Sequence, residues 1–222
     1  MEVETLLVEF ADVFARSADD LGRTSIISQE INTSGTRPIH QYPRRLPLSQ
    51  GVEAEAEIAN MLQRGVNEPS SSPWASPIIL VRKKDGTTCF CVDYRRLNAA
   101  TLKDSYPLPH IGDFLATLSG SCWFSTLDLA SGYWQVELCE EDRPKTAFTM
   151  GSGLYQFTVM PFGLCNAPAT FERLMERVLS GLPWEVCLMY LDDIIVHAKT
   201  FEAELDQLRP VFTRVREAGL KK

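Results

Sequence analysis

Apolar and polar residues alternate along this chain with two periods, and the mixture of helical and strand-like segments predicts an α+β fold. Apolar side chains three or four positions apart predict helices over 4–16, 49–66, 107–118, 168–179 and 201–220. Runs of strand-forming residues predict strands over 24–31, 78–82, 89–94 and 122–138 and hairpins over 148–160 and 186–198. From residue 122 onward the predicted elements follow the order strand, hairpin, helix, hairpin, helix. This order suits a sheet with helices on one face and acids on the other.

Some helix predictions extend to individual residues. Ser49 is placed to cap the second helix, and Gly65 is placed to end it. Pro210 lies inside the last helical pattern and predicts a kink or a split there. The expected apolar stripes are Leu7, Phe10 and Phe14 in the first helix and Val52, Ala56, Ala59, Leu62 and Val66 in the second.

The segment VCLMYLDDIIVHA, residues 186–198, places Asp192 and Asp193 at the tip of the last predicted hairpin. Two neighbouring ionised carboxylates repel each other, and a divalent cation would neutralise them. Oxygen ligands point to Mg²⁺ or Mn²⁺. The alternative is an ordinary polar turn, since Asp is a frequent turn residue.

A third carboxylate, Asp128, lies inside the strand-like segment CWFSTLDLASGYWQVEL, residues 122–138. Asp is rare in strand interiors and costly to bury without a cation. If the fold brings Asp128 beside Asp192, three carboxylates gather around one or two metal ions. Such a ligand set suits phosphoryl transfer with two metals.

Composition restricts the remaining possibilities. The hydrophobic fraction is 45%, and no apolar run is long enough to span a membrane. The first residues are acidic, which argues against a signal peptide. We therefore expect an intracellular protein without membrane contact. Six cysteines and three histidines show no zinc-ligand spacing, and we expect free, packed thiols. The formal net charge of −7 has the wrong sign for a simple nucleic-acid binder.

Positive charge is nevertheless concentrated locally. Five Lys and Arg side chains fall between residues 82 and 96. The segment 33–47 is rich in proline and should run extended over the surface. Its arginines, Arg37, Arg44 and Arg45, fit either contact with a nucleic-acid backbone or a solvated face.

The chain carries several long motifs: Tyr190-Leu191-Asp192-Asp193, FSTLDLASGYWQ (124–135), VMPFGLCNAPATFERLM (159–175), SSPWASPIILVRKKDG (71–86) and CVDYRRLN (91–98). Together these motifs resemble reverse transcriptases of gypsy-type long-terminal-repeat retrotransposons. The resemblance covers about residues 30 to 220. It implies an RNA-directed DNA polymerase with the palm of a right-hand polymerase over 106–222, fingers over 31–105 and an N-terminal helix and linker over 1–30.

The resemblance also implies a role for each matching residue. Asp128, Asp192 and Asp193 are the catalytic acids. Asp128 and Asp192 bind two Mg²⁺ or Mn²⁺ ions directly, Asp193 is the less direct third acid, and the Leu129 carbonyl is a further ligand. Residues of the nucleotide site are Lys83, Lys84, Ser131, Gly132, Tyr133, Phe162 and Gly163. Tyr133 matches the aromatic gate that excludes a 2′-hydroxyl, although it could be a core aromatic. Residues of the template path are Asp93, Arg95 and Pro168.

The partners implied are an RNA or DNA primer-template, deoxynucleoside triphosphates and the other Pol domains: protease, thumb, RNase H and integrase. The resemblance places the protein in the cytoplasm, in a virus-like particle or in the nucleus.

The chain departs from the family pattern at four places. Cys89 stands where the family has an Arg that contacts the α-phosphate, and Met150-Gly151-Ser152 replaces a polar-Pro-Phe turn. Pro210 interrupts a helical pattern, and the sequence stops at Lys222, before a primer grip and thumb. Two interpretations stay open: a reverse transcriptase domain, or a truncated or domesticated fragment acting as an interaction module.

Overall fold

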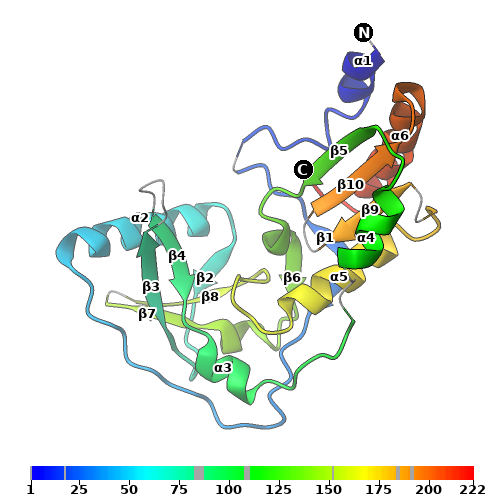
Figure 1. The fold of residues 1–222 in the computed structure, drawn as a ribbon. Helices are drawn as coiled ribbons and strands as arrows, with labels where there is room; N and C mark the ends of the chain where they lie inside the picture. The colour runs from blue at the N-terminus through cyan, green and yellow to red at the C-terminus, as the bar shows by residue number, and fades with distance from the viewer. Residues whose placement is uncertain are drawn as a thin grey trace. The chain divides into compact units, whose positions relative to one another are not determined.

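The computed structural model describes residues 2–17, 19–82, 88–107, 111–151, 153–183, 186–190 and 193–222. They form two compact units (Figure 1). The first unit comprises Met1–Ile27, Ser105–Gln135 and Pro168–Lys222, and the second comprises Ser28–Asp104 and Val136–Ala167. The sequence analysis divides the chain into residues 1–30, 31–105 and 106–222. The structure instead groups residues 1–27 with 105–135 and 168–222, and it groups residues 136–167 with 28–104.

A three-stranded antiparallel sheet forms the centre of the first unit (Figure 1). Its strands, in order, are β5 (Trp123–Asp128), β10 (Asp193–Ala198) and β9 (Cys187–Tyr190). The predicted hairpin at 186–198 is therefore confirmed within the described residues. The predicted strand at 122–138 is confirmed only in part: β5 ends at Asp128, and a 3₁₀ helix over Gly132–Gln135 separates it from the short strand β6 (Val136–Leu138). The helices of this unit are α1 (Glu2–Glu9), α4 (Ile111–Leu118), α5 (Ala167–Val178, whose first residue belongs to the second unit) and α6 (Phe201–Glu217).

Helix α6 packs against β10 and β5 through an apolar side that includes Leu208, Phe212 and Val215. Pro210 lies inside α6, which runs from Phe201 to Glu217 as one helix, so the predicted split is wrong. A proline removes one helical hydrogen bond, and the buried apolar side of the helix offsets that loss. Helix α5 is confirmed: Pro168 lies in its first turn, and Phe171, Leu174, Met175 and Val178 are buried.

Helix α1 is shorter than predicted, and its buried side differs. It ends at Glu9, and Leu6 rather than Leu7 is buried. Backbone bonds of the following segment explain the early end. The Ala15 amide donates to the Lys222 carbonyl at 2.7 Å, and the Lys222 amide donates to Val13 at 2.9 Å, which is a strand-like pairing. The sequence pattern carries no information about this distant partner.

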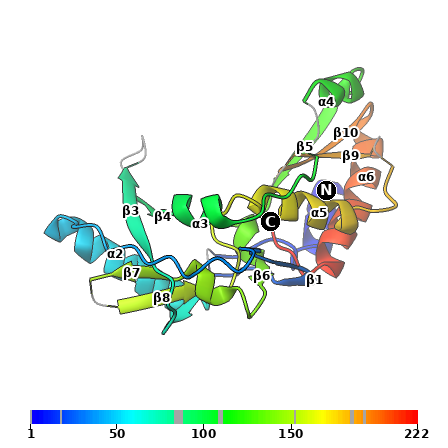
Figure 2. The same cartoon turned by 90° about the horizontal axis from the view of Figure 1, so that it is seen from below.

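The second unit contains a five-stranded sheet in the order β2 (Asn67–Pro69), β8 (Gly153–Phe157), β7 (Phe148–Met150), β3 (Ser76–Arg82) and β4 (Thr88–Val92). The predicted hairpins β3–β4 and β7–β8 are confirmed in their described parts. Strand β3 pairs with β7 only through Ser76 and Pro77, and then continues with β4 as a hairpin that projects from the sheet (Figure 2). Phe148 is fully buried, with ring centroids of Phe90, Tyr155 and Phe157 within 5.9 Å.

This unit also contains α2 (Leu48–Gln63), α3 (Arg95–Ala100), β6 (Val136–Leu138), a short 3₁₀ helix (Arg143–Thr146) and the end of β1 (Thr24–Gln29), which begins in the first unit. Gly65 ends α2 with a φ of 65°, as predicted. The predicted cap and stripe of α2 are wrong. Pro47 is the N-cap, Ser49 lies within the helix, and Ala54, Ile58 and Met61 are buried while Val52 is exposed. Apolar residues occur on two sides of α2, and periodicity alone cannot choose between them.

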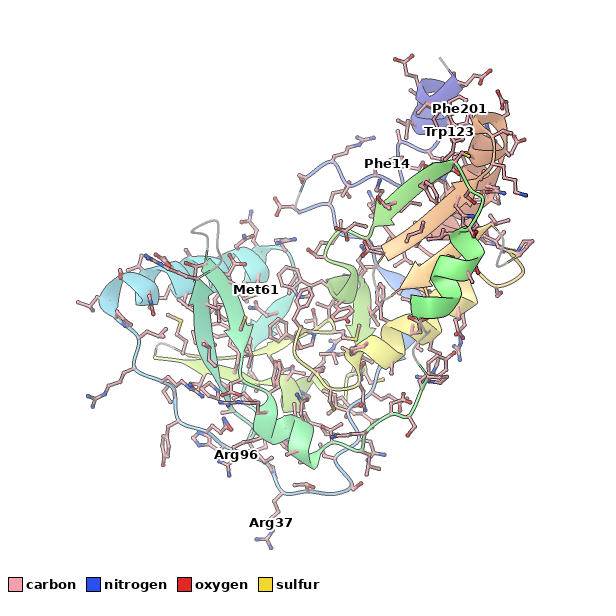
Figure 3. All side chains as sticks on the ribbon, in the orientation of Figure 1. Phe14, Arg37, Met61, Arg96, Trp123 and Phe201 are labelled. Atoms are coloured by element: carbon pink, nitrogen blue, oxygen red, sulfur yellow. The ribbon has the colours of Figure 1, made fainter. Side chains whose placement is uncertain are left out.

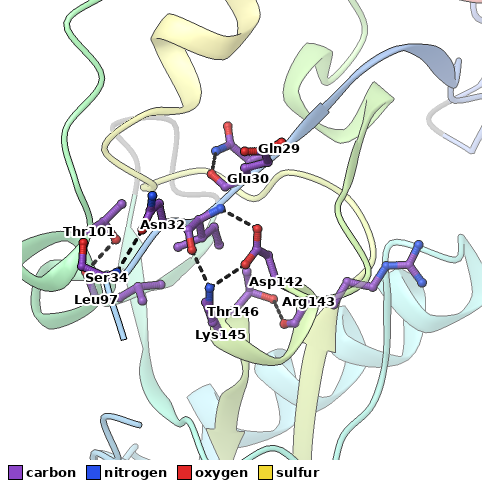
Figure 4. A network of polar contacts seen from close by, with 11 residues as sticks. Gln29, Glu30, Asn32, Ser34, Leu97, Thr101, Asp142, Arg143, Lys145 and Thr146 are labelled. Atoms are coloured by element: carbon purple, nitrogen blue, oxygen red, sulfur yellow. Dashed lines mark hydrogen bonds and ion pairs between the residues drawn. The ribbon is translucent and has the colours of Figure 1, made fainter. Parts of the chain in front are cut away.

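A buried carboxylate stabilises the segment that follows β1 (Figure 4). Asp142 accepts the Ile31 amide at 2.8 Å and the Lys145 ammonium at 2.6 Å, and that ammonium also donates to the Ile31 carbonyl at 2.6 Å. Both polar groups of the Ile31 backbone are thus satisfied by residues more than a hundred positions away.

We expect Asp142→Ala to lower the free energy of unfolding by about 2–3 kcal/mol, because it leaves a buried amide and a half-buried ammonium without their acceptor. Urea unfolding measures this change. Glu140→Ala, which removes a neighbouring exposed carboxylate, is the control and should change stability by less than about 0.5 kcal/mol. Equal stabilities of the two variants would contradict the assigned role of Asp142.

Candidate active site

The two carboxylates Asp128 and Asp193 face each other across neighbouring strands. Asp193 on β10 is the direct antiparallel partner of Asp128 on β5, and both residues are exposed. Directly opposed residues point to the same face with Cβ atoms about 5 Å apart. Two like charges at this spacing destabilise the sheet unless a cation lies between them.

Three of the predicted site residues lie outside the described residues: Asp192, Lys83 and Lys84. Within the described ranges, no group of three or more His, Cys, Asp or Glu is arranged to hold a metal ion. The described donor set is therefore the pair Asp128 and Asp193. Accessible carboxylate oxygens on one face of a sheet are the ligand type that Mg²⁺ and Mn²⁺ prefer, so the residues fit a divalent cation.

A tight turn follows Asp128. Ser131 has a φ of 49°, and the Gly132 amide donates to the Leu129 carbonyl at 3.1 Å. The Trp134 amide donates to the Ser131 carbonyl at 2.8 Å and leads into a short 3₁₀ helix over Gly132–Gln135. Of the backbone groups predicted to meet metal or triphosphate, the Leu129 carbonyl and the Gly132 amide are thus already bonded to each other.

Helix α5 supports this turn. A Cβ atom at Gly132 would lie 3.0 Å from the Phe171 ring, so only glycine allows this approach without a shift. The Tyr133 ring lies 5.3 Å from the Phe171 ring, centroid to centroid, and Tyr133 is half-buried. The buried Phe171 ring therefore fixes the direction of Tyr133 relative to the strand that carries Asp128.

Sequence reasoning missed the role of Gln135. This fully buried side chain donates to the Ala130 carbonyl at 2.8 Å and to the Lys221 carbonyl at 2.7 Å, and it accepts the Lys221 amide at 2.8 Å. It thereby ties the turn after Asp128 to the end of the chain. The sequence signal for this role was the polar side chain of Gln135 inside an apolar run.

In the second unit, Phe162 and Gly163 lie in an exposed turn held by α3. Gly163 has a φ of 94°, which favours glycine. The Asn98 amide group donates to the Gly163 carbonyl at 2.7 Å and accepts the Cys165 amide at 2.9 Å. Asn98 thus sets the shape of this turn while the Phe162 ring stays accessible.

Asp93, at the end of β4, binds two arginines. Arg95 donates through Nε to Oδ1 at 2.8 Å and through Nη2 to Oδ2 at 2.7 Å, and Arg44 donates to Oδ2 at 2.5 Å. The hydrogen bonds from Arg95 lower the pKa of Asp93 to about 2, although burial opposes the shift. The carboxylate therefore stays ionised, and holds both guanidiniums, at any pH above about 4.

Comparisons with known proteins identify the family. The family model described as "Reverse transcriptase (RNA-dependent DNA polymerase)" matches residues 81–221. The chain belongs to this family. Two relatives from Drosophila melanogaster are the Pol polyprotein of transposon 297, 38% identical over 227 residues, and that of transposon gypsy, 35% identical over 221 residues. These alignments cover 99% and 96% of this chain but 21% of each relative, so this reverse transcriptase chain spans about one fifth of their length.

Solved structures agree with this assignment. The prototype foamy virus protease-reverse transcriptase is 27% identical to this chain, with a TM-score of 0.88. The alignment covers 99% of this chain and 29% of the viral chain. The foamy viral enzyme in complex with an RNA/DNA hybrid is 25% identical, with a TM-score of 0.86 and coverages of 99% and 29%. The α+β polymerase fold and the relation to gypsy-type Pol polyproteins, both expected from the sequence, are confirmed. Among the described helices, none is long and apolar enough to cross a membrane.

Proposed function

We propose that this chain adds deoxynucleotides to a primer 3′-hydroxyl under the direction of an RNA or DNA template. One observation carries the proposal: in a member of the reverse transcriptase family, β5 and β10 set Asp128 and Asp193 face to face on an accessible surface. Opposed carboxylates repel each other, and the divalent cations used in phosphoryl transfer would neutralise them.

Two divalent ions, Mg²⁺ or Mn²⁺, would be held by Asp128, Asp193, Asp192 and the Leu129 carbonyl. When bound, such ions lower the pKa of the attacking hydroxyl and neutralise the leaving pyrophosphate. The chain's own residues position these ligands. Strands β5 and β10 fix the two opposed carboxylates, and Gln135 holds the turn that follows Asp128.

The remaining roles follow the family resemblance. Tyr133 acts as the gate against a 2′-hydroxyl, and Ser131 and Gly132 border the triphosphate. Lys83 and Lys84 would hold the outer phosphates. Residues that complete the nucleotide pocket and the template path are Phe162, Gly163, Asp93, Arg95 and Pro168.

The same proposal covers partners and location. The chain works on a primer-template with deoxynucleoside triphosphates, inside the cell, as one part of a longer Pol polyprotein. Its similarity over nearly its whole length to about one fifth of such polyproteins supports this arrangement.

Primer extension tests the proposed function. The chain is mixed in excess with a labelled DNA primer on an RNA or DNA template, Mg²⁺ or Mn²⁺, and one deoxynucleoside triphosphate at a time. We expect one-nucleotide extension only with the triphosphate complementary to the template base. Absence of extension with every triphosphate and both metals, or extension that ignores the template, would overturn the proposal.

Cys89 offers a further test. It lies on β4 opposite Val81, and its Sγ is 3.5 Å from the Cys91 Sγ. A thiol is a weak donor, whereas a guanidinium offers a planar fork to a phosphate that gains charge during the reaction. We therefore expect Cys89→Arg to increase the rate of single-nucleotide addition by about tenfold or more, which corresponds to 1.4 kcal/mol or more.

The comparison is made at saturating primer-template, with Cys91→Arg, two positions along the same strand, as the matched control. Equal rates of the parent chain and Cys89→Arg would show that Cys89 does not limit catalysis.

A further inference from the structure

Two cysteine side chains lie together on the hairpin β3–β4, which projects from the sheet of the second unit (Figure 2). Cys89 and Cys91 are two positions apart on β4, so both point to the same face of the strand. Their Sγ atoms are 3.5 Å apart, and both residues are half-buried and reduced. Their spacing in the sequence matches no zinc motif, but the strand sets the two thiols side by side as a dithiol.

The two faces of this hairpin have different surroundings. On one face, the Phe90 ring packs on Phe148 and lines a hollow of about 400 Å³ beside α2. Met61 of that helix is buried inside the unit (Figure 3). The thiols lie on the other face, with their direct cross-strand neighbours Val81 and Ile79. Val81 is 48% exposed, so ions in solution can reach the face that carries the thiols.

A disulfide fits this position poorly. Each residue of a strand advances by about 3.2–3.4 Å, so the Cα atoms of residues two positions apart are separated by about 6.4–6.8 Å. Most disulfides join Cα atoms about 5.5–6 Å apart, and about 6.8 Å is the upper end of their range. Strand β4 pairs with β3 along its whole length, which resists the shortening that a bond between Cys89 and Cys91 requires.

A metal ion shared by the two sulfurs fits better. Zinc–thiolate bonds are about 2.3 Å long, and at a tetrahedral angle two such bonds separate their sulfurs by about 3.8 Å. The Sγ atoms of Cys89 and Cys91 are already 3.5 Å apart, so a small rotation of the side chains admits the ion without moving the strand. Thiolate sulfur selects soft cations, whereas Mg²⁺ and Mn²⁺ prefer oxygen ligands.

We propose that Cys89 and Cys91 together chelate one thiophilic divalent cation of the Zn²⁺ class, with water in its remaining coordination positions. Each thiol loses its proton, two sulfur–metal bonds form, and the two protons pass to the solvent. Two protein ligands are fewer than the four of a structural zinc site, so the ion exchanges with solution. The carboxylates Asp128 and Asp193 belong to the first unit, and the dithiol site does not rest on the proposed polymerase function.

A Cd²⁺ titration of the full chain, reduced beforehand and freed of reductant, tests the proposal. Cadmium–thiolate bonds absorb ultraviolet light that the free ion does not, so the absorbance reports ions bound to sulfur. Excess Mg²⁺ is present throughout to fill sites with oxygen ligands. We expect saturation at one Cd²⁺ per chain, release of two protons per ion and an affinity that increases with pH. A large excess of Zn²⁺ should displace the Cd²⁺.

Three serine variants locate the site. Cys89→Ser and Cys91→Ser each remove one sulfur and nearly preserve side-chain size. Each should weaken Cd²⁺ binding about a hundredfold or more, because the second sulfur of a chelate binds as an intramolecular ligand. Cys122→Ser is the matched control, since it removes an exposed thiol of the first unit, and it should bind Cd²⁺ like the parent.

Exchange with glutathione disulfide tests the geometric argument separately. In this reaction the two thiols would form one disulfide and release two molecules of reduced glutathione. We expect Cys89 and Cys91 to stay reduced in a glutathione buffer poised at about −220 mV, because a strained disulfide has a higher reduction potential. Alkylation followed by mass spectrometry counts the remaining thiols.

Several results would overturn the proposal. They are unchanged Cd²⁺ binding by Cys89→Ser or Cys91→Ser, an equal loss in Cys122→Ser, release of fewer than two protons per ion, and failure of Zn²⁺ to compete. Complete conversion to a Cys89–Cys91 disulfide in the glutathione buffer would likewise show that β4 does not hold the sulfurs at a chelating distance. Primer extension by the parent chain is decided independently of all these results.

Discussion

Replacing Asp128 with Asn is expected to reduce template-directed nucleotide addition about a thousandfold while leaving the fold intact. The amide keeps the size of the side chain and removes the charge that a divalent ion needs. Because Asp128 and Asp193 oppose each other across β5 and β10, losing one charge also relieves repulsion. The free energy of unfolding without metal should therefore stay equal or rise by about 0.5–1 kcal/mol.

Single-turnover extension and urea unfolding measure the two effects on the same preparation. Asp206→Asn is the matched control, since it removes an exposed carboxylate of α6, and it should change neither quantity. If Asp128→Asn extended primers at the parental rate, or if both variants lost activity equally, Asp128 would not be a catalytic acid.

The second large effect is expected at Tyr133. Its ring leans on the buried Phe171 ring beside the turn that follows Asp128, so its position is fixed relative to that acid. If the ring blocks the space of a 2′-hydroxyl, Tyr133→Ala should lower the preference for deoxyribonucleotides over ribonucleotides by about 100-fold, or about 2.7 kcal/mol. The ratio of kcat/KM for matched deoxyribonucleotides and ribonucleotides measures this preference.

Tyr133→Phe provides the control, because it keeps the ring and loses only the hydroxyl. It should retain the parental preference. A Tyr133→Ala variant that is less stable but discriminates like the parent would make Tyr133 a packing residue, the alternative reading of its sequence position.

Short-range features of this fold could be predicted from the sequence. The strand around Asp128, the hairpin that carries Asp193 and the start of α5 at Pro168 each follow from local pattern, turn residues and proline geometry. The opposition of Asp128 and Asp193 is different. The sequence predicts Asp128 inside a strand and Asp193 at the tip of a hairpin. The observed register, with Asp128 at the end of β5, is what brings these two side chains together.

Features that depend on distant partners were missed. Helix α1 ends early because residues 13–15 pair with Lys222, and the buried side of α2 depends on which of its two apolar sides meets the sheet. The shared anchoring of Arg44 and Arg95 on Asp93 joins residues 49 positions apart, and periodicity carries no record of such a contact. The sequence therefore predicts local elements better than it predicts the distant contacts that hold them in place.

A Mn²⁺ titration tests directly whether Asp128 and Asp193 form a metal site. Binding is measured as the loss of the electron paramagnetic resonance signal of free Mn²⁺. We predict that the parent chain and Asp206→Asn bind Mn²⁺ with equal affinity. Asp128→Asn and Asp193→Asn should each bind it at least about tenfold more weakly. Equal binding by the parent and all three variants would show that the cation is held elsewhere and would contradict the proposed site.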